Sequence, residues 1–323
     1  MRKVIELNND WYFKLDYADG MELNNQVDGF EKVNLPHNTV EVPYNYFDES
    51  IYQRKSIYKY KIKAEKTYKG KAVYINFQGV MSYAKVFLNG IYLGEHKGGY
   101  TPFDIRIDNA VNYSSDENVL SVVVDSSEID TIPPFGGQID YLTYGGIYRE
   151  VSISIYDNVF IDRVKIETPN VLDDKKNVEV YAYINNLDKR KENVDFRIDI
   201  ISKDGKIQRS ENYKRELKPF DEVYLFKIEN LNNIKLWDID EPNLYEIRIK
   251  LISDNLEDEY KEKFGFRKAE FTSRGFYLNG KRLKIRGLNR HQSYPYVGYA
   301  MPKRVQEKDA VILKEELHGT LRI

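Results

Sequence analysis

The chain has 323 residues, and 49 Lys and Arg against 51 Asp and Glu give a formal net charge of −2 at pH 7. This length allows about two or three domains, and the balanced charge argues against a nucleic-acid-binding surface, which would carry a basic excess. Cysteine is absent, which excludes disulfides, cysteine nucleophiles and cysteine-based zinc sites.

Hydropathy and aromatic content indicate where the protein acts and which secondary structure it forms. No apolar run approaches the roughly 18 residues that cross a bilayer, and the first residues, MRKVIELNNDWYF, lack the apolar core of a signal peptide. We therefore expect a cytoplasmic protein that binds neither membranes nor nucleic acid. The 27 tyrosines favour strands, and in loops their flat rings with polar tips suit sugar binding.

The first predicted domain, residues 1–157, is an antiparallel β-sandwich. Between Lys71 and Val124 short alternating runs are separated by turns, in KAVYINFQGV, AKVFLNGIYLGEH, FDIRI and NVLSVVV. Asn89-Gly90 lies between two apolar runs and predicts a type I′ hairpin turn. Strands spaced about ten residues apart, without helical periodicity between them, are typical of a sandwich.

A long loop interrupts this pattern from Ile129 to Arg149, IDTIPPFGGQIDYLTYGGIYR. Two prolines, four glycines and several aromatic residues predict a structured loop of the kind that carries function on a rigid scaffold. The strand EVSISIY then closes the domain.

Residues 158–268 form the second predicted domain. Alternating runs such as NVEVYAYINN, VDFRIDIISKDGK and YEIRIKLIS, with a hairpin turn at Asp204-Gly205, give about seven strands and indicate an immunoglobulin-like sandwich. The lack of cysteine excludes the version that is crosslinked by a disulfide.

Residues 269–323 change in character. We predict a hairpin turn at Asn279-Gly280, a strand at Leu283–Leu288, a helix from Pro302 to its C-cap Gly319, and the start of a strand at Thr320–Ile323. One face of the helix carries Val305, Ile312, Leu313 and Leu317. Strand, helix and strand make one βαβ unit, which cannot bury its faces alone.

Common catalytic motifs are missing from the chain. The four histidines, His37, His96, His291 and His318, are widely separated, and no HExxH, GxSxG, P-loop or GxGxxG occurs. The glycine pairs at 98–99, 136–137 and 145–146 are best interpreted as turn formers. Composition and spacing alone therefore predict a mainly β protein of two sandwiches, followed by the start of an α/β element.

The order of four motifs adds a family resemblance. Asp140 opens DYLTYGGIYREV, and Arg286–Pro302 reads RGLNRHQSYPYVGYAMP. Upstream lie NLPHNT at Asn34–Thr39 and YQRKSIYKYKI at Tyr52–Ile62. Together they resemble glycoside hydrolase family 2, and RGLNRHQSYP is most similar to its β-galactosidases. The resemblance implies an N-terminal jelly-roll sugar-binding domain, an immunoglobulin-like domain, and the truncated first βα segment of a (β/α)8 catalytic barrel.

The same resemblance implies retaining hydrolysis of terminal β-galactosides. One Glu protonates the glycosidic oxygen and a second attacks the anomeric carbon. In the family the acid/base Glu follows an Asn, and no Asn-Glu dipeptide occurs in this sequence. We therefore expect the Glu pair to lie beyond residue 323, no catalytic residue within this chain, and no activity of the chain alone.

Four residues are implied as substrate-binding candidates. Asp140 matches an Asp that reaches the barrel mouth, where a carboxylate can accept hydrogen bonds from two sugar hydroxyls. His291 matches the His that lines the sugar subsite, at the C-terminal end of the predicted barrel strand. Asn289 is expected to hold this loop beside the subsite, as is Arg286. Arg54 matches a position near the site.

Other expectations and alternatives remain open. Arg149 is predicted to form a structural ion pair. No cofactor is expected to be required, although the resemblance allows a Mg or Na ion beside Asp140 and a homo-oligomer in a full-length enzyme. The alternatives are a stand-alone carbohydrate-binding or interaction protein, and a β-glucuronidase or β-mannosidase of the same family.

Overall fold

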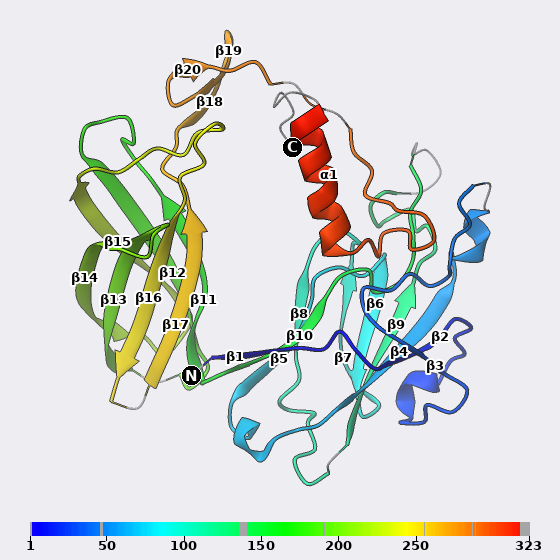
Figure 1. Ribbon diagram of the computed structural model, residues 1–323. Helices are drawn as coiled ribbons and strands as arrows, with labels where there is room; N and C mark the ends of the chain where they lie inside the picture. Colours follow the sequence, from blue (N-terminus) through cyan, green and yellow to red (C-terminus); the bar gives the residue numbers. More distant parts are fainter. Residues whose placement is uncertain are drawn as a thin grey trace. The chain divides into compact units, whose positions relative to one another are not determined.

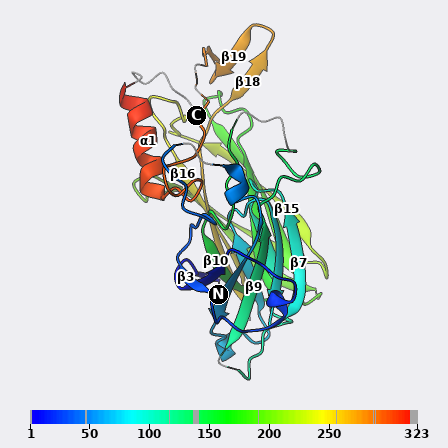
Figure 2. The ribbon, with the colours of Figure 1, turned by 90° about the vertical axis from the view of Figure 1, so that its right-hand side faces the viewer.

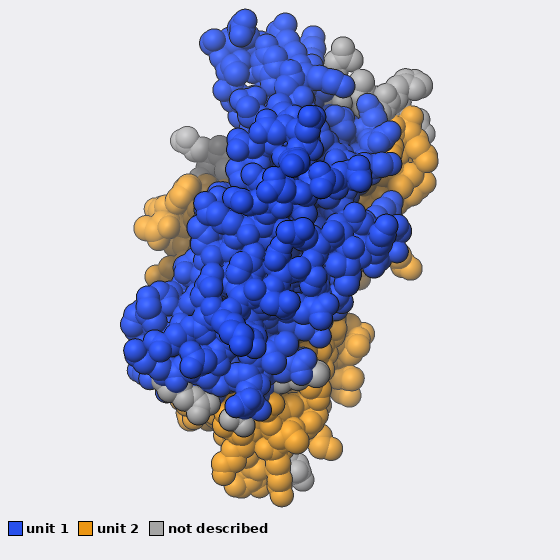
Figure 3. Space-filling view, turned by 90° about the vertical axis from the view of Figure 1, so that its left-hand side faces the viewer, with its two compact units in different colours: residues 1–2, 156–286, 322 blue, residues 3–155, 287–321, 323 orange. Residues whose placement is uncertain are grey.

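The fold divides into two compact units, which Figure 3 shows in two colours. Unit 1 comprises residues 1–2, 156–286 and 322, and unit 2 comprises residues 3–155, 287–321 and 323. The computed structural model describes residues 2–45, 48–115, 117–135, 141–189, 191–254, 256–285, 287 and 289–316.

Unit 2 is a sandwich of two sheets (Figure 1). The four-stranded sheet has the order β1 (Lys3–Glu6), β10 (Val151–Tyr156), β5 (Ala72–Phe77) and β8 (Phe103–Arg106). The six-stranded sheet has the order β3 (Glu31–Val33), β2 (Trp11–Lys14), β4 (Lys55–Ile62), β9 (Asn118–Asp125), β6 (Tyr83–Leu88) and β7 (Ile91–Lys97). Three short 3-10 helices accompany them, at Met21–Leu23, Glu49–Ile51 and Lys66–Tyr68.

The core of unit 2 follows from the alternation seen in the sequence. Trp11, Tyr58, Ile75 and Val122 come from four different strands and are fully buried in one apolar cluster. Each side chain of this size stabilises the fold by about 1.5–3 kcal/mol on burial. The predicted jelly-roll-type sandwich is confirmed.

Local turn chemistry also agrees with the prediction. Asn89 and Gly90 have φ angles of 53° and 78°, as a type I′ turn between β6 and β7 requires. The strand that follows this turn, β7, is an outer strand of its sheet (Figure 2). The long connection between β9 and β10 forms no regular strand in its described residues, as expected for a structured loop.

Unit 1 contains the predicted immunoglobulin-like sandwich, with seven strands among its described residues. Its core is continuous and includes Phe196, Ile198, Phe226, Ile247 and Ile249, each at most 1% exposed. One sheet has the order β11 (Val159–Glu167), β12 (Lys176–Asn186) and β15 (Glu222–Leu231). The other has the order β14 (Ile207–Leu217), β13 (Glu192–Ser202), β16 (Tyr245–Ser253) and β17 (Leu256–Phe264).

A small three-stranded sheet follows, with β18 (Ala269–Thr272), β19 (Gly275–Leu278) and β20 (Lys281–Arg282). Asn279 and Gly280, with φ angles of 50° and 76°, form the predicted turn between β19 and β20.

The last described segment differs in part from the prediction. Helix α1 (Lys303–Glu316) begins one residue after Pro302, as predicted. The strand predicted at Leu283–Leu288 is wrong for its described residues, 283–285 and 287, which are not in a strand. Leu283 N instead donates to Phe276 O of β19 at 2.8 Å, so the chain here extends the contacts of the small antiparallel sheet. Leu317, Gly319 and Thr320–Ile323 lie outside the described residues, and the domain boundaries stay predictions.

No helix in the described part of the chain is long and apolar enough to cross a membrane.

One carboxylate on the sheet of β13 is almost completely buried. Asp199 is 1% exposed and accepts hydrogen bonds from Ser210 Oγ at 2.6 Å, Arg248 Nη2 at 3.0 Å and Arg197 Nε at 3.2 Å. Burial alone would raise the pKa of this carboxyl, but the bonds from Ser210, Arg248 and Arg197 outweigh it and lower the pKa of Asp199.

We predict that Asp199→Asn lowers the free energy of unfolding by about 2 kcal/mol at pH 7, because two charge-assisted bonds are weakened. The control Asp195→Asn, at an exposed position of the same strand, should change it by less than about 0.5 kcal/mol. Urea titration measures both. Because the folded-state pKa lies below the unfolded one, the wild-type advantage should fade as the pH drops below about 4. Equal losses in both variants would contradict the role given to Asp199.

Candidate functional site

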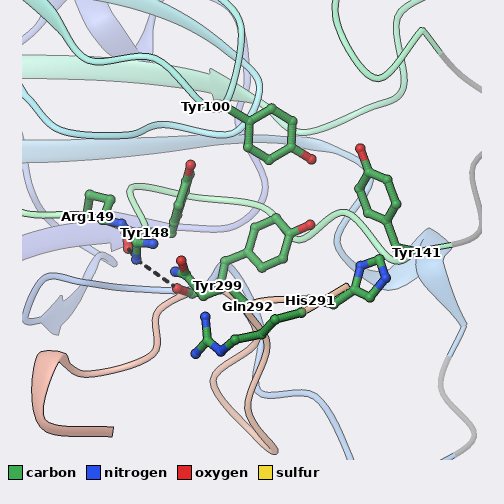
Figure 4. Close-up of a pocket in the computed structure, with 8 residues that line it drawn as sticks. Tyr100, Tyr141, Tyr148, Arg149, His291, Gln292 and Tyr299 are labelled. Atoms are coloured by element: carbon green, nitrogen blue, oxygen red, sulfur yellow. Dashed lines mark hydrogen bonds between the residues drawn. The ribbon is translucent and has the colours of Figure 1, made fainter. Parts of the chain in front are cut away.

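A pocket lies within unit 2, in the loops next to the sandwich. Its cavity measures about 230 Å³, and tyrosines and cationic side chains line it (Figure 4). The lining residues are Tyr100, Tyr141, Tyr148, Arg149, Arg290, His291, Gln292 and Tyr299.

Three chain segments build this pocket. Tyr100 lies in the turn between β7 and β8, and residues 141–149 belong to the long loop between β9 and β10. Residues 290–299 form the segment that precedes α1. Backbone and side-chain bonds join the last two: Tyr299 Oη donates to Leu142 O at 2.9 Å, and Arg149 Nη1 donates to Tyr299 O at 3.3 Å.

Three phenol groups point into one space (Figure 4). The Tyr100 hydroxyl interacts with those of Tyr141 and Tyr299. Burial, followed by these two hydroxyl neighbours, raises the pKa of Tyr100, and burial also raises the pKa of Tyr299. The two phenols are therefore neutral at pH 7 and can both donate and accept hydrogen bonds.

The floor of the pocket is rigidly packed. Tyr148 is 6% exposed, and its hydroxyl donates to Gly99 O at 2.5 Å. The Tyr299 ring centre lies 5.5 Å from that of Tyr148. Gly99 has to be a glycine, because a Cβ there would lie 1.9 Å from Met81 Sδ. This close approach holds the turn that carries Tyr100.

Arg149 differs from its prediction. Its guanidinium lies 4.8 Å from the Tyr148 ring centre, and Nη1 donates to the carbonyl oxygens of Tyr148 and Tyr299. Among the described residues it has no carboxylate within ion-pair distance, so the predicted ion pair is not observed. The Arg149 guanidinium donates to backbone carbonyl oxygens instead, because the turn Gly-Gly-Ile-Tyr-Arg places it beside the backbone of Tyr299.

Arg290 joins the pocket to α1. Its Nη2 lies 2.5 Å from Asp309 Oδ2 and 3.1 Å from Gln306 Oε1, both on the helix, and Nε lies 2.9 Å from Asp309 Oδ2. This charge-assisted fork fixes the start of the segment that carries His291 and Gln292.

The substrate-binding candidates are distributed unevenly around the pocket. His291 lines it, exposed to solvent, with its ring centre 5.3 Å from that of Tyr141. Asn289 is exposed and is not among the lining residues. Arg54, 44% exposed, also lies outside the lining and pairs with Asp16 at 3.3 Å. Asp140 and Arg286 lie outside the described residues. A sugar contact by any of these residues stays a prediction.

Sequence reasoning missed several lining residues. Tyr100, Tyr141 and Arg290 were not candidates, although Tyr141 and Arg290 lie inside the quoted motifs. The sequence also marked the position of Tyr100, since the glycine pair before it indicates a close backbone approach. The sequence could not show that Tyr100 lies beside Tyr141 and Tyr299, about 40 and 200 positions away.

The lining chemistry suits a ring-shaped polyhydroxylated ligand. Aromatic faces can pack on apolar C–H surface, while phenol, amide and guanidinium groups bind hydroxyls. Among the described residues that line the pocket, none has a carboxylate. Within the described residues no group of three His, Asp or Glu could hold a metal ion.

Comparisons with known families cover most of the chain. The sugar binding domain of glycosyl hydrolases family 2 matches residues 22–158, and the domain described as glycosyl hydrolases family 2 matches residues 159–267.

Individual relatives agree with this assignment. A protein named beta-galactosidase of Thermoanaerobacterium thermosulfurigenes is 58% identical over 98% of this chain and 44% of its own length. A beta-glucuronidase of Bacteroides fragilis is 29% identical over 100% of the chain and 46% of its own. The crystal structure of Bacteroides uniformis beta-glucuronidase superposes with a TM-score of 0.87 at 26% identity, over 100% of this chain and 39% of that one. The chain thus spans less than half the length of these proteins.

We predict that Arg290→Gln makes the backbone amides of α1 exchange with solvent about fivefold faster, for a loss of about 1 kcal/mol in this partly exposed ion pair. Arg304→Gln, at an exposed position of the same helix without a described partner, is the matched control and should leave exchange unchanged. Hydrogen exchange read by mass spectrometry measures both. Identical exchange in Arg290→Gln and the wild type would show that the fork does not hold the helix.

Proposed function

Because the chain belongs to glycoside hydrolase family 2, we propose that it forms the sugar-binding part of a retaining β-galactosidase and that its pocket holds a terminal β-galactoside. The pocket chemistry carries this proposal: an aromatic cavity in unit 2 whose described lining residues offer phenol, amide and guanidinium groups. The 58% identity to a protein named beta-galactosidase supports the galactoside over other sugars.

The residues of the chain have separate tasks in this proposal. The half-exposed ring of Tyr100 packs against the apolar face of the sugar, and the Tyr141 hydroxyl exchanges hydrogen bonds with the sugar's hydroxyl groups. The Tyr299 oxygen, whose proton is donated to Leu142 O, accepts from a sugar hydroxyl. The guanidinium of Arg149 donates from the pocket floor. Since tyrosine rings have only two side-chain torsions, they orient the ligand at low entropic cost.

Binding and bond cleavage are proposed to be separable. A retaining glycosidase needs two carboxyl groups about 5–5.5 Å apart, and the described pocket lining contains none. The 323 residues by themselves are therefore proposed to bind a galactoside without hydrolysing it. A metal ion and a homo-oligomer are not needed for this step, and both stay predictions.

A second candidate ligand is a β-glucuronoside. Two guanidinium groups line the pocket, and that of Arg149 has only carbonyl partners among the described residues. A uronate carboxylate would form a charge-assisted pair with it. A beta-glucuronidase is also among the relatives, although at 29% identity.

The decisive test is calorimetric titration of the purified chain with isopropyl β-thiogalactoside and with phenyl β-thioglucuronide. We expect saturable binding of the galactoside, weaker binding of the glucuronide, and no release of nitrophenol from nitrophenyl β-galactoside. Tyr100→Ala should weaken galactoside binding about fivefold, because a stacking contact of about 1 kcal/mol is lost.

Tyr92→Ala is the matched control, since Tyr92 is 51% exposed against 47% for Tyr100 and does not line the pocket. Equal weakening by both variants would disprove the pocket as the site. Tighter binding of the glucuronide would replace the galactoside with the second candidate. Absence of any binding would contradict the proposed function.

A further inference from the structure

The turn at residues 145–147, which leads into the pocket residues Tyr148 and Arg149, has every backbone carbonyl bonded. Gly145 O accepts from Thr39 N at 3.3 Å, and Gly146 O accepts from Met81 N at 3.0 Å. Ile147 O accepts from His37 N at 2.9 Å. Backbone hydrogen bonds alone thus hold the turn between the segment 37–39 and Met81, two residues before β6.

A buried hydroxyl completes this attachment from β4. Tyr58 is 0% exposed, and its oxygen lies 2.8 Å from His37 Nδ1. Nδ1 can accept the phenol proton only while it is unprotonated, which a neutral imidazole allows. The Tyr58 hydroxyl then holds the ring of His37, whose own backbone amide donates to Ile147 O.

The surroundings of His37 keep it neutral. Burial lowers the pKa of His37 to about 4, and the ring of Phe13 lies edge-on at 4.7 Å. Burial raises the pKa of Tyr58, and Glu31 on β3 contributes in the same direction. No carboxylate forms an ion pair with His37 among the described residues.

The turn has no room to adjust. Gly146 has a φ of 105°, and a Cβ there would lie 2.6 Å from the Tyr58 hydroxyl and 2.7 Å from His37 O. A Cβ on Gly145 would lie 2.4 Å from Ser126 Oγ. A side chain therefore does not fit at either position of the turn that leads into the pocket.

We propose that His37, which does not line the pocket, is a positioning residue: by accepting the Tyr58 hydroxyl proton it fixes the segment 37–39, whose amides bond the turn at residues 145–147, and with it the places of Tyr148 and Arg149. This inference depends on the proposed function only in the choice of the ligand that the pocket binds. The alternative is that His37 fills space, in which case its hydrogen bond would not matter to the pocket.

Three variants separate the hydrogen bond from the packing. His37→Leu removes the acceptor, and Tyr58→Phe removes the hydroxyl while keeping the ring. His37→Asn keeps an acceptor oxygen at the δ position and cannot be protonated. Val73→Ala, at a buried core position of the other sheet, is the control for a general loss of stability.

The first readout needs no ligand. We expect the Thr39 amide, which donates to Gly145 O, to exchange about fivefold to tenfold faster in His37→Leu and Tyr58→Phe, because the segment that carries it is held less firmly, and to stay near the wild-type rate in His37→Asn. In Val73→Ala it should change no more than the amides of β4. A uniform change along β4 and the turn in all variants would overturn the proposal.

The second readout is the affinity for isopropyl β-thiogalactoside. His37→Leu and Tyr58→Phe should weaken it about fivefold at pH 7, while His37→Asn should bind like the wild type. As the pH falls from 7 towards 4, the wild type gains a proton on Nδ1 and loses the acceptor, so its affinity should drop relative to that of His37→Asn. Circular dichroism at each pH confirms that both remain folded.

Parallel pH profiles for the wild type and His37→Asn, or weakening by Val73→Ala equal to that by His37→Leu, would overturn the positioning role. If the wild type binds no galactoside, the proposed function fails, and the exchange of the Thr39 amide still decides whether His37 positions the turn.

Discussion

The pocket depends on a steric constraint at two consecutive glycines. Gly145 and Gly146 pass so close to Ser126 and Tyr58 that no side chain fits at either position. Because only bare backbone can follow this route, the carbonyls of the turn meet the donors of residues 37–39 and of Met81. These backbone bonds therefore fix where the residues on both sides of the turn lie.

Two reciprocal hydrogen bonds join the pocket segment at residues 290–299 to the long loop at residues 141–149. Tyr299 donates its hydroxyl proton to Leu142 O, and its own carbonyl accepts from Arg149. Gly298 approaches Tyr144 so closely that a Cβ would lie 2.5 Å from its ring. A segment distant in sequence is therefore positioned by the loop of the sandwich, and α1 is joined to it through Arg290 and Asp309. Such preorganisation reduces the entropy lost when a ligand binds.

Family membership and pocket chemistry explain different properties of the chain. The two family domains account for the sandwiches of residues 22–158 and 159–267. Fold alone does not determine a ligand, and the relatives include proteins named for β-galactosides and for β-glucuronides. The features that distinguish such ligands are local: neutral phenols that share hydrogen bonds, and a guanidinium whose described partners are carbonyl oxygens.

Sequence by itself determined what depends on neighbours in the chain. Alternation predicted the strands of both sandwiches. Asn89-Gly90 in the first sandwich and Asn279-Gly280 in the small sheet of β18 to β20 form the predicted turns, because these residue types tolerate positive φ angles. The motif order predicted the family. Tertiary structure decided what depends on distant partners: the strand predicted at 283–288 is absent from its described residues, and Leu283 N donates to Phe276 O of β19 instead. Tyr100 likewise joins Tyr141 and Tyr299 only in the folded chain. The physical reason is that turn angles and burial periodicity are encoded locally, whereas hydrogen-bond partners and close approaches between remote segments exist only after the chain has folded.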